Sequence, residues 1–417
     1  MKIFKFGGAS IKDAKSVKNI YDILQKTGYD NTLLVISAMG KTTNALEIVL
    51  KNYFDNPTKL QESIQEVKKY HLQIAIELFD ENNHPILNTI NTHFNQMEFF
   101  LNHNKSPNYS FVYDQVVSYG EIIATAIISH YFNYKGLKNS CIDVRNFIKT
   151  DTSYRDAAVD WNQTLELISK GIKRKQLNIT QGFLGSDPNN FTTTLGREGS
   201  DYTAAIFAYC LNAESVTIWK DVPGVLSADP RYFENAVLLE QISYREAIEL
   251  AFYGATVIHP KTLQPLQKKE IPLYVRSFIN PELSGTKVSK NVKIIPQTAC
   301  FIVKKEQCLI SLSSIDFSFI MEEHISEIFK LLHQYKMKVS LIQNSAISFS
   351  VCVEDKFHNF LKLKSALSKK FLINWNENVS LYTIRYYTKE SVDMIGKDKT
   401  ILIKQILGDT IQVVTKD

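Results

Sequence analysis

The chain has 417 residues, more than one hydrophobic core normally serves, so we expect two or three domains. A hydrophobic content of 44% indicates globular domains, and a net charge of +5 with scattered lysines does not indicate nucleic-acid binding. The five cysteines lie in apolar runs without a Cys-x-x-Cys pair, which is typical of buried thiols in a reducing compartment. Because the chain starts with a strand-like segment and no apolar run reaches membrane-spanning length, we expect a cytoplasmic protein without a membrane partner.

Short apolar or β-branched runs alternate with amphipathic segments through residues 1–295. This alternation predicts an α/β domain in which helices sandwich a mostly parallel sheet. The predicted strands are Lys2–Phe6, Leu33–Ser37, Ser140–Val144, Asn178–Gly182, Ser215–Trp219 and Leu273–Arg276. Between about residues 45 and 130 helical periodicity replaces the strand signal, so we expect a helical insertion there.

Two loops follow the first two predicted strands. Lys5 precedes Gly7, Gly8 and Ser10, so its ammonium lies beside bare backbone at the sheet edge where parallel sheets bind ligands. This combination suits a phosphate, and an exposed lysine beside a glycine turn is the alternative. The second loop contains Gly40-Lys41-Thr42 but is no Walker A segment, because the position five residues before Gly40 is a valine. It still offers the hydroxyls of Ser37 and Thr43 to a polar ligand.

The segment Gly196–Tyr202 is the most informative part of the sequence. Arg197 lies between Gly196 and Gly199, and Ser200 and Asp201 follow at the start of a predicted helix. We expect Ser200 or Asp201 to cap that helix, whose free N–H groups and dipole then face the loop. The planar guanidinium of Arg197 suits a carboxylate or a phosphate. A capped surface turn is the alternative.

Three further positions carry chemistry. Glu121 lies on an apolar helix face and therefore needs a cation, either a lysine or arginine of the chain or an amine-bearing substrate. Asp221 and Arg231 lie in a turn-rich segment and either serve a nucleotide or pair with each other. His259 has no second ligand nearby, so we interpret it as structural and predict no protein metal site.

The pattern changes near residues 281–296, where we place a domain boundary. Beyond it, a βαββ order is predicted, with strands at Cys308–Leu312, Lys338–Ile342 and Ala346–Val353 and a helix near Ile325–Leu332. Residues 296–417 are thus a second region. Its last part repeats the theme only weakly, with strands at Ser380–Arg385 and Thr410–Val414 and no long helix, so the second unit is expected to be degenerate.

Taken together, these motifs resemble the aspartate kinases of the amino acid kinase family over about residues 1–290. The motifs that carry the resemblance, in order and spacing, are Lys5–Ser10, Ser37–Asn44, Gly120-Glu121, Gly196–Tyr202, Asp221–Arg231 and Gly254–Pro260. The resemblance implies transfer of the γ-phosphoryl group of ATP, with Mg²⁺, to the side-chain carboxylate of L-aspartate. The product is 4-phospho-L-aspartate, on the way to lysine, threonine and methionine. No general base is needed, because a carboxylate is already ionised at neutral pH.

The family's roles fall on matching positions. The resemblance implies catalytic roles for Lys5 and Asp201. The positions implied for aspartate are Ser37, Thr43, Glu121, Arg197 and Ser200. The positions implied for the nucleotide are Lys5, Gly7, Gly8, Ser10, Lys220, Asp221, Leu226 and Arg231.

Three positions depart from the family pattern, namely Ala9 (usually threonine), Glu198 (usually glycine) and Thr256 (a lysine in many members). We expect Glu198 to point outward, since an inward carboxylate would weaken phosphate binding.

The C-terminal region resembles ACT modules, small α+β units of ferredoxin type. The resemblance implies a homodimer through this region and an amino-acid effector, lysine or threonine. No homoserine dehydrogenase domain is expected, because the chain has no Gly-x-Gly-x-x-Gly there. Two alternatives stay open, a catalytically weakened amino-acid sensor with the same fold and another amino acid kinase. The pair of Arg197 and Glu121 favours a free α-amino acid as the substrate.

Overall fold

The computed structural model describes residues 1–416 except 80–82, 256, 317 and 397–398. The chain forms two compact units. The first comprises Met1–Val225, Leu238–Ile248 and Val257–Ile295, and the second comprises Leu226–Val237, Glu249–Thr256 and Pro296–Asp417. Two short segments that precede the expected boundary at residue 296 therefore belong to the second unit.

The first unit is built on an eight-stranded sheet with the order β3-β4-β2-β1-β7-β9-β10-β8. Its strands are β1 (Lys2–Phe6), β2 (Thr32–Ile36), β3 (Asn139–Ile142), β4 (Leu177–Gln181), β7 (Ser215–Lys220), β8 (Gln241–Ser243), β9 (Leu273–Ser277) and β10 (Thr286–Ser289). All pairs from β3 to β9 are parallel, and β10 runs antiparallel to β9. The six predicted strands are these parallel ones, so the predicted fold class is confirmed. A separate hairpin, β5 (Leu184–Ser186) with β6 (Thr192–Thr194), was missed.

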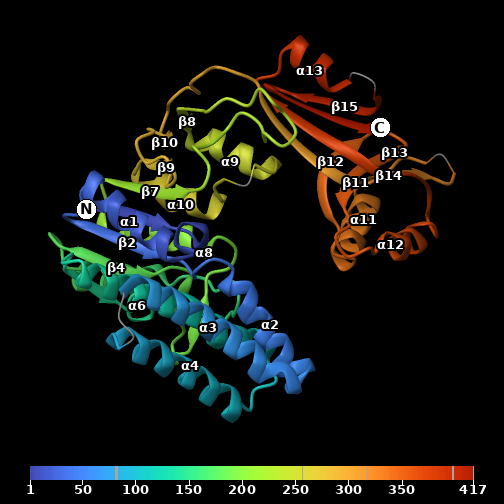
Figure 1. Ribbon diagram of the computed structural model, residues 1–417. Coiled ribbons are helices and arrows are strands. Elements are labelled where there is room, and N and C mark those ends of the chain that lie inside the picture. Colours follow the sequence, from blue (N-terminus) through green and yellow to red (C-terminus); the bar gives the residue numbers. More distant parts are fainter. Residues whose placement is uncertain (80–82, 256, 317, 397–398, 417) are drawn as a thin grey trace. The chain divides into compact units, whose positions relative to one another are not determined.

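Helices cover both faces of this sheet (Figure 1). Alternate residues of β1 and β2, such as Phe6 and Leu34, share one core with helices α1, α3, α4 and α6. The helices of the unit are α1 (Ala14–Thr27), α2 (Thr42–Asp55), α3 (Leu60–Phe79), α4 (Pro85–His103), α5 (Tyr109–Val117), α6 (Tyr119–Tyr134), α7 (Trp161–Gly171), α8 (Gly199–Leu211), α9 (Tyr244–Tyr253, divided between the units) and α10 (Pro260–Lys269). The predicted helical insertion is thus the layer α2–α6.

One helical stretch, Tyr109–Tyr134, is long and apolar enough to cross a membrane by length and composition. The sequence expectation that no segment reaches this length was therefore wrong. However, 72% of its most apolar window is buried inside the protein. Burial of this kind is typical of a core helix that is hydrophobic all round.

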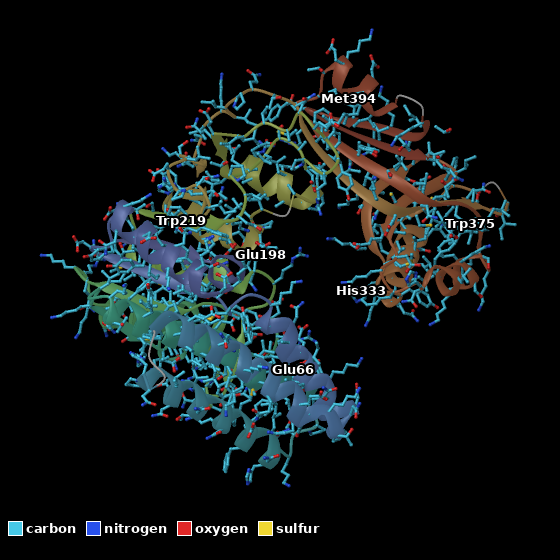
Figure 2. The ribbon with its side chains drawn as sticks, viewed as in Figure 1. Glu66, Glu198, Trp219, His333, Trp375 and Met394 are labelled. Atoms are coloured by element: carbon cyan, nitrogen blue, oxygen red, sulfur yellow. The ribbon has the colours of Figure 1, made fainter. Side chains whose placement is uncertain are left out.

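Trp219 anchors the centre of the sheet (Figure 2). Its ring stacks on Phe6 at 5.9 Å between centroids and meets Phe4 edge-on at 6.0 Å. The guanidinium of Arg276 lies 5.1 Å from the ring centroid. Because Lys220 follows directly in the chain, this packing fixes the end of β7, where a functional side chain is expected.

The second unit contains a six-stranded antiparallel sheet with the order β12-β13-β11-β14-β16-β15. Its strands are β11 (Cys300–Ser314), β12 (Lys338–Asn344), β13 (Ser348–Glu354), β14 (Phe371–Arg385), β15 (Thr400–Leu407) and β16 (Thr410–Lys416), and its helices are α11 (Glu322–Gln334), α12 (Phe360–Leu367) and α13 (Lys389–Gly396). The strands predicted for the first repeat lie within β11, β12 and β13 or overlap them. The second half follows the order β14-α13-β15-β16. Its helix has only eight residues, which explains the missing helical periodicity.

Replacing Leu34 with alanine tests the parallel core. Leu34 is fully buried in β2, so Leu34→Ala should lower the free energy of unfolding of the first unit by about 2–5 kcal/mol. Urea unfolding measures this change. The matched control is Leu165→Ala in α7, because Leu165 is 39% exposed and its loss should cost well under half as much. Equal losses in the two variants would contradict the assigned core.

Candidate active site

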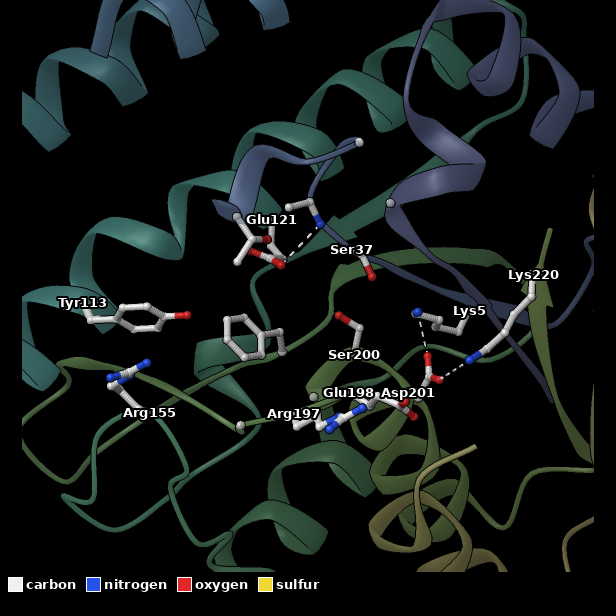
Figure 3. Close-up of a pocket in the computed structure, with 17 residues that line it drawn as sticks. Lys5, Ser37, Tyr113, Glu121, Arg155, Arg197, Glu198, Ser200, Asp201 and Lys220 are labelled. Carbon is white, nitrogen blue, oxygen red and sulfur yellow. Dashed lines mark hydrogen bonds and ion pairs between the residues drawn. The ribbon is translucent and has the colours of Figure 1, made fainter. Parts of the chain in front are cut away.

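A cavity of about 470 Å³ lies at the carboxyl ends of β1, β2, β4 and β7 (Figure 3). Strand ends at this edge of a parallel sheet are the usual place for a ligand, and the start of α8 adds free backbone N–H groups. The residues lining it are Lys5, Gly8, Ser37, Ala38, Gly40, Thr43, Tyr113, Glu121, Arg155, Phe183, Gly196, Arg197, Glu198, Gly199, Ser200, Asp201 and Lys220. The structure thus brings the motifs from four distant parts of the sequence into one site.

Asp201 lies between two lysines at one end of the cavity. Its Oδ1 is 2.6 Å from Nζ of Lys5, and its Oδ2 is 3.6 Å from Nζ of Lys220. Nζ of Lys220 also donates to the carbonyl oxygen of Val257. Burial raises the pKa of Asp201, but the charges of Lys5 and Lys220 outweigh it and hold the pKa below the usual range. The carboxylate is therefore ionised and keeps both ammonium groups aimed at the same point.

Glu121 lies in α6 on another wall of the cavity. Its side chain is buried, its Oε1 accepts a hydrogen bond of 3.2 Å from the N–H of Ala38, and its Oε2 has no partner among the described residues. The buried ion pair considered from the sequence is therefore absent from the described part of the chain. Burial raises the pKa of Glu121 to about 8, against the smaller opposing effects of the Ala38 N–H and the charge of Lys5. An unpartnered buried carboxyl that faces a cavity is suited to a ligand cation.

Arg197 lies on the wall of the same cavity at the start of α8. It is exposed, and its guanidinium has no hydrogen bond or ion pair to any residue that the structure describes. Ser37, Thr43 and Ser200 bring hydroxyl groups to the cavity. Gly182 is needed behind Ser200, because a Cβ at Gly182 would lie 2.5 Å from the Cβ of that serine.

The two glycine-containing loops pack against each other. Gly8 lines the cavity, and a Cβ on it would lie 2.6 Å from the carbonyl oxygen of Gly40. The carbonyl oxygen of Gly8 accepts from the N–H of Gly40 at 3.0 Å. Gly7 and Ser10 do not line the cavity, and the hydroxyl of Ser10 donates to the carbonyl oxygen of Gly7 at 2.6 Å. Ser10 thus holds the loop from behind.

Besides Gly7 and Ser10, three more residues proposed for the nucleotide do not line the cavity. Asp221 is exposed after the end of β7, and Leu226 belongs to the second unit. Arg231 pairs with Asp229 at 2.6 Å and is 79% exposed, so the local turn pair forms, though with Asp229 rather than Asp221. A nucleotide role for these residues stays a prediction. Thr256 lies outside the described residues.

Sequence reasoning missed the wall formed by Tyr113 and Arg155, which Figure 3 shows away from Lys5 and Lys220. The guanidinium of Arg155 is 4.5 Å from the ring centroid of Tyr113, whose hydroxyl donates to Glu47 at 3.1 Å. Both oxygens of buried Asp114 accept from the N–H of Arg155. Only the tertiary fold joins these helices and loops. A signal was nevertheless present, since Asp114 is a charged residue in an otherwise apolar helical segment.

The expected cap of α8 was wrong. The helix begins at Gly199, and its N-cap residue is Glu198, in left-handed conformation with φ 54° and without a side-chain capping hydrogen bond. The expectation that Glu198 points outward was also wrong, because it lines the cavity and its Oε2 is buried without a partner among the described residues. A left-handed conformation costs a non-glycine residue about 1–2 kcal/mol, so this site carries local strain.

The model of the amino acid kinase family matches residues 1–277. Lysine-sensitive aspartokinase 3 of Escherichia coli is 30% identical over 355 residues, which cover 84% of this chain and 78% of the relative. The chain belongs to the amino acid kinase family, in its aspartokinase branch. A bifunctional aspartokinase/homoserine dehydrogenase of Buchnera aphidicola is 28% identical over 91% of this amino acid kinase, which spans only 47% of that relative.

Solved structures of other proteins are similar to this chain along both of its units. Aspartokinase III of Escherichia coli in complex with lysine and aspartate matches with a TM-score of 0.85 and 26% identity, covering 99% of this chain and 95% of the other. The same enzyme in complex with aspartate and ADP matches with a TM-score of 0.81 and 26% identity, covering 100% and 96%. The agreement extends to the antiparallel C-terminal sheet and supports its interpretation as an ACT-like region.

Glu121 makes the stability of the first unit depend on pH. Its pKa of about 8 in the folded state lies above the ordinary value of 4.5. The protonated carboxyl therefore contributes fully to the free energy of unfolding below pH 4.5, and this contribution is lost as the pH rises through 8. Between these pH values the free energy of unfolding of the parent should fall by about 1 kcal/mol per pH unit relative to that of Glu121→Gln. Urea unfolding of both proteins at pH 6, 7 and 8 measures the difference. Parallel pH profiles would show that Glu121 is ionised in the folded protein.

Proposed function

We propose that this protein is an aspartate kinase that transfers the γ-phosphoryl group of ATP to the side-chain carboxylate of L-aspartate, giving 4-phospho-L-aspartate. The carrying observation is that one cavity has the two-lysine cluster around Asp201 on one side, and the unpartnered Oε2 of Glu121 and the unpaired guanidinium of Arg197 around the rest. The first group suits a migrating phosphoryl group, and the second suits a zwitterion. The relatives are named aspartokinases, and one related structure contains aspartate and ADP.

Glu121 and Arg197 divide the recognition of the amino acid. The unpaired Oε2 of Glu121 receives the α-ammonium group, and the free guanidinium fork of Arg197 receives the α-carboxylate. The hydroxyls of Ser37, Thr43 and Ser200 supply further hydrogen bonds. With both α-groups held, the side-chain carboxylate is left as the nucleophile, and its position toward Lys5 supplies the proximity that catalysis needs.

Lys5 and Lys220 stabilise charge on the phosphoryl group during transfer. Asp201 fixes both ammonium groups, so they do not reorganise when negative charge develops on the phosphoryl oxygens. The N–H groups near Gly8 and at the start of α8 can donate to the same oxygens. We assign Asp221, Leu226 and Arg231 to the nucleotide on the family pattern alone.

The carboxylates at this end of the cavity fit Mg²⁺ as a partner of ATP. Among the described residues no group of three or more His, Cys, Asp or Glu side chains can hold a metal ion. This is compatible with Mg²⁺, which is commonly held by one or two carboxylates together with substrate phosphates. When bound, the ion neutralises phosphate charge.

We further propose that the C-terminal sheet serves regulation and dimerisation. One related structure of high similarity contains lysine together with aspartate, so lysine is the first effector to test and threonine the second. The five free cysteines support a reducing, cytoplasmic location. The alternative of an amino-acid sensor without activity is disfavoured, because the phosphoryl-handling Lys5 and its Asp201 partner are both in place and a sensor would not need them.

Formation of aspartyl hydroxamate with ATP and Mg²⁺ tests the activity. Lys5→Ala should lower kcat about 10²–10³-fold, because it removes a preorganised charge from the transferring group. Arg197→Ala should mainly raise the KM for aspartate. Lys2→Ala, an exposed lysine of the same strand, is the matched control and should leave both constants unchanged. A parent protein that forms no hydroxamate would overturn the proposal.

Aspartate binding should release protons. The pKa of Glu121 is about 8, so at pH 7 most molecules carry a neutral carboxyl that must ionise to receive the ammonium group. Almost one proton per bound aspartate should leave, and the affinity should fall about tenfold per pH unit below pH 8. Calorimetry in two buffers of different ionisation enthalpy measures this release. Glu121→Gln should abolish it, and buffer-independent heats in the parent would contradict the assignment.

A further inference from the structure

Glu198 is the one acidic side chain lining the cavity to which the proposed function assigns no individual role. Its Oε2 is buried, and no residue of the described chain pairs with it. It makes no capping hydrogen bond to α8, although it occupies the N-cap position. The residue keeps this arrangement in a left-handed conformation that glycine adopts more easily. Helix capping therefore does not explain the carboxylate, and solvation does not explain its buried Oε2.

The position of Glu198 defines which ligand it meets. It is the N-cap of α8 and Asp201 is the third residue of the helix, so the two residues are three positions apart in the chain, and both line the cavity. Figure 3 draws Glu198 on the side of the cavity where Asp201 lies, away from Tyr113. Glu198 is thus at the phosphoryl end of the cavity, and Glu121 occupies the amino-acid end.

The charges at this end call for a further cation. Lys5 and Lys220 carry two positive charges, and Asp201 and Glu198 balance them. Nζ of the nearby Lys261 is already engaged with Asp156 at 2.7 Å and with the carbonyl oxygen of Leu195 at 3.1 Å. With Arg197 assigned to the carboxylate of the amino acid, these four groups carry no net charge, and a cation that accompanies the nucleotide polyphosphate supplies the missing positive charge.

We propose that Glu198 is an oxygen ligand, direct or through water, for the divalent cation that accompanies the nucleotide. This inference rests on the proposed kinase function and adds a chain-specific ligand to it. Carboxylate oxygen is a preferred donor for Mg²⁺, which uses one or two carboxylates and completes its shell with phosphate oxygens and water. The need for phosphate ligands explains why the protein alone supplies no cluster of three metal-binding side chains within its described residues.

Calorimetric titration with ADP separates this role from simple repulsion of phosphate. Glu198→Gln keeps the size of the side chain and removes its charge. If Glu198 binds the cation, the variant should bind ADP in the presence of Mg²⁺ on the order of tenfold more weakly, and metal-free ADP in EDTA equally well or more tightly. Glu166→Gln is the charge-matched control, because Glu166 is an exposed residue of α7 paired with Lys170, and it should change neither affinity.

A second variant guards against a folding defect. Glu198→Gly removes the carboxylate and relieves the left-handed strain, so its thermal midpoint should equal or exceed that of the parent. It should lose Mg²⁺-dependent ADP affinity to the same extent as Glu198→Gln. With Mn²⁺ in place of Mg²⁺, water-proton relaxation of the bound Mn²⁺–ADP complex should change in both variants, since a ligand or its bridging water has been lost.

The outcomes are distinct. Unchanged or tighter binding of ADP with Mg²⁺ in Glu198→Gln would overturn the metal role and show that the carboxylate only repels phosphate. A raised KM for aspartate with unchanged ADP binding would overturn it in favour of a contact with the amino acid. Because ADP binding is measured without aspartate, failure of the parent to phosphorylate aspartate leaves this test intact and counts only against the proposed reaction.

Discussion

The ion pairs of Asp201 with Lys5 and Lys220 are the interaction on which the site depends. They join the end of β1, the start of α8 and the end of β7, three elements that are far apart in the sequence. The two lysines repel each other, so the carboxylate between them is what allows both to face one ligand. Its burial prevents water from screening these charges. With a neutral side chain at this position, the two ammonium groups would repel each other and would not be held toward one ligand.

This constraint explains the layout of the rest of the site. The sheet supplies rigid strand ends, and the stacked rings of Trp219 and Phe6 hold β7 against β1. The two glycine loops pack backbone on backbone, which leaves no room for a Cβ at Gly8. The other end, which we propose for the amino acid, includes the helical layer, where α6 supplies a carboxyl that burial keeps largely neutral. In the proposed function, the start of α8 thus serves both ends of the cavity through Asp201 and Arg197, and the helical layer adds the group for the ammonium.

Local sequence carried enough information for the parallel sheet and for most of the site. The six parallel strands were predicted from short runs rich in apolar or β-branched residues, and Lys5, Glu121, Arg197 and Asp201 stand out by chemistry alone. The hairpin β5–β6 was missed because three consecutive threonines show no alternation of polar and apolar residues. Arg155 could not be placed, since its position depends on Asp114 and Tyr113 in a distant helix. The side chain of Glu198 was wrongly predicted to point outward, because its direction depends on the left-handed backbone conformation of Glu198 itself (φ 54°).

Strands β11 and β14 have a mechanical consequence for the C-terminal unit. Each has 15 residues and runs through both halves of the sheet, and the two pair along nearly their whole length. Separate apolar clusters cover the two halves, one with α11 and α12 and the other with α13. The halves therefore have their own cores, and the pairing of the two shared strands is irregular between Lys304 and Leu309, where the halves meet. A ligand that changed the twist of one half would reach the other half through these two strands, across this irregular stretch.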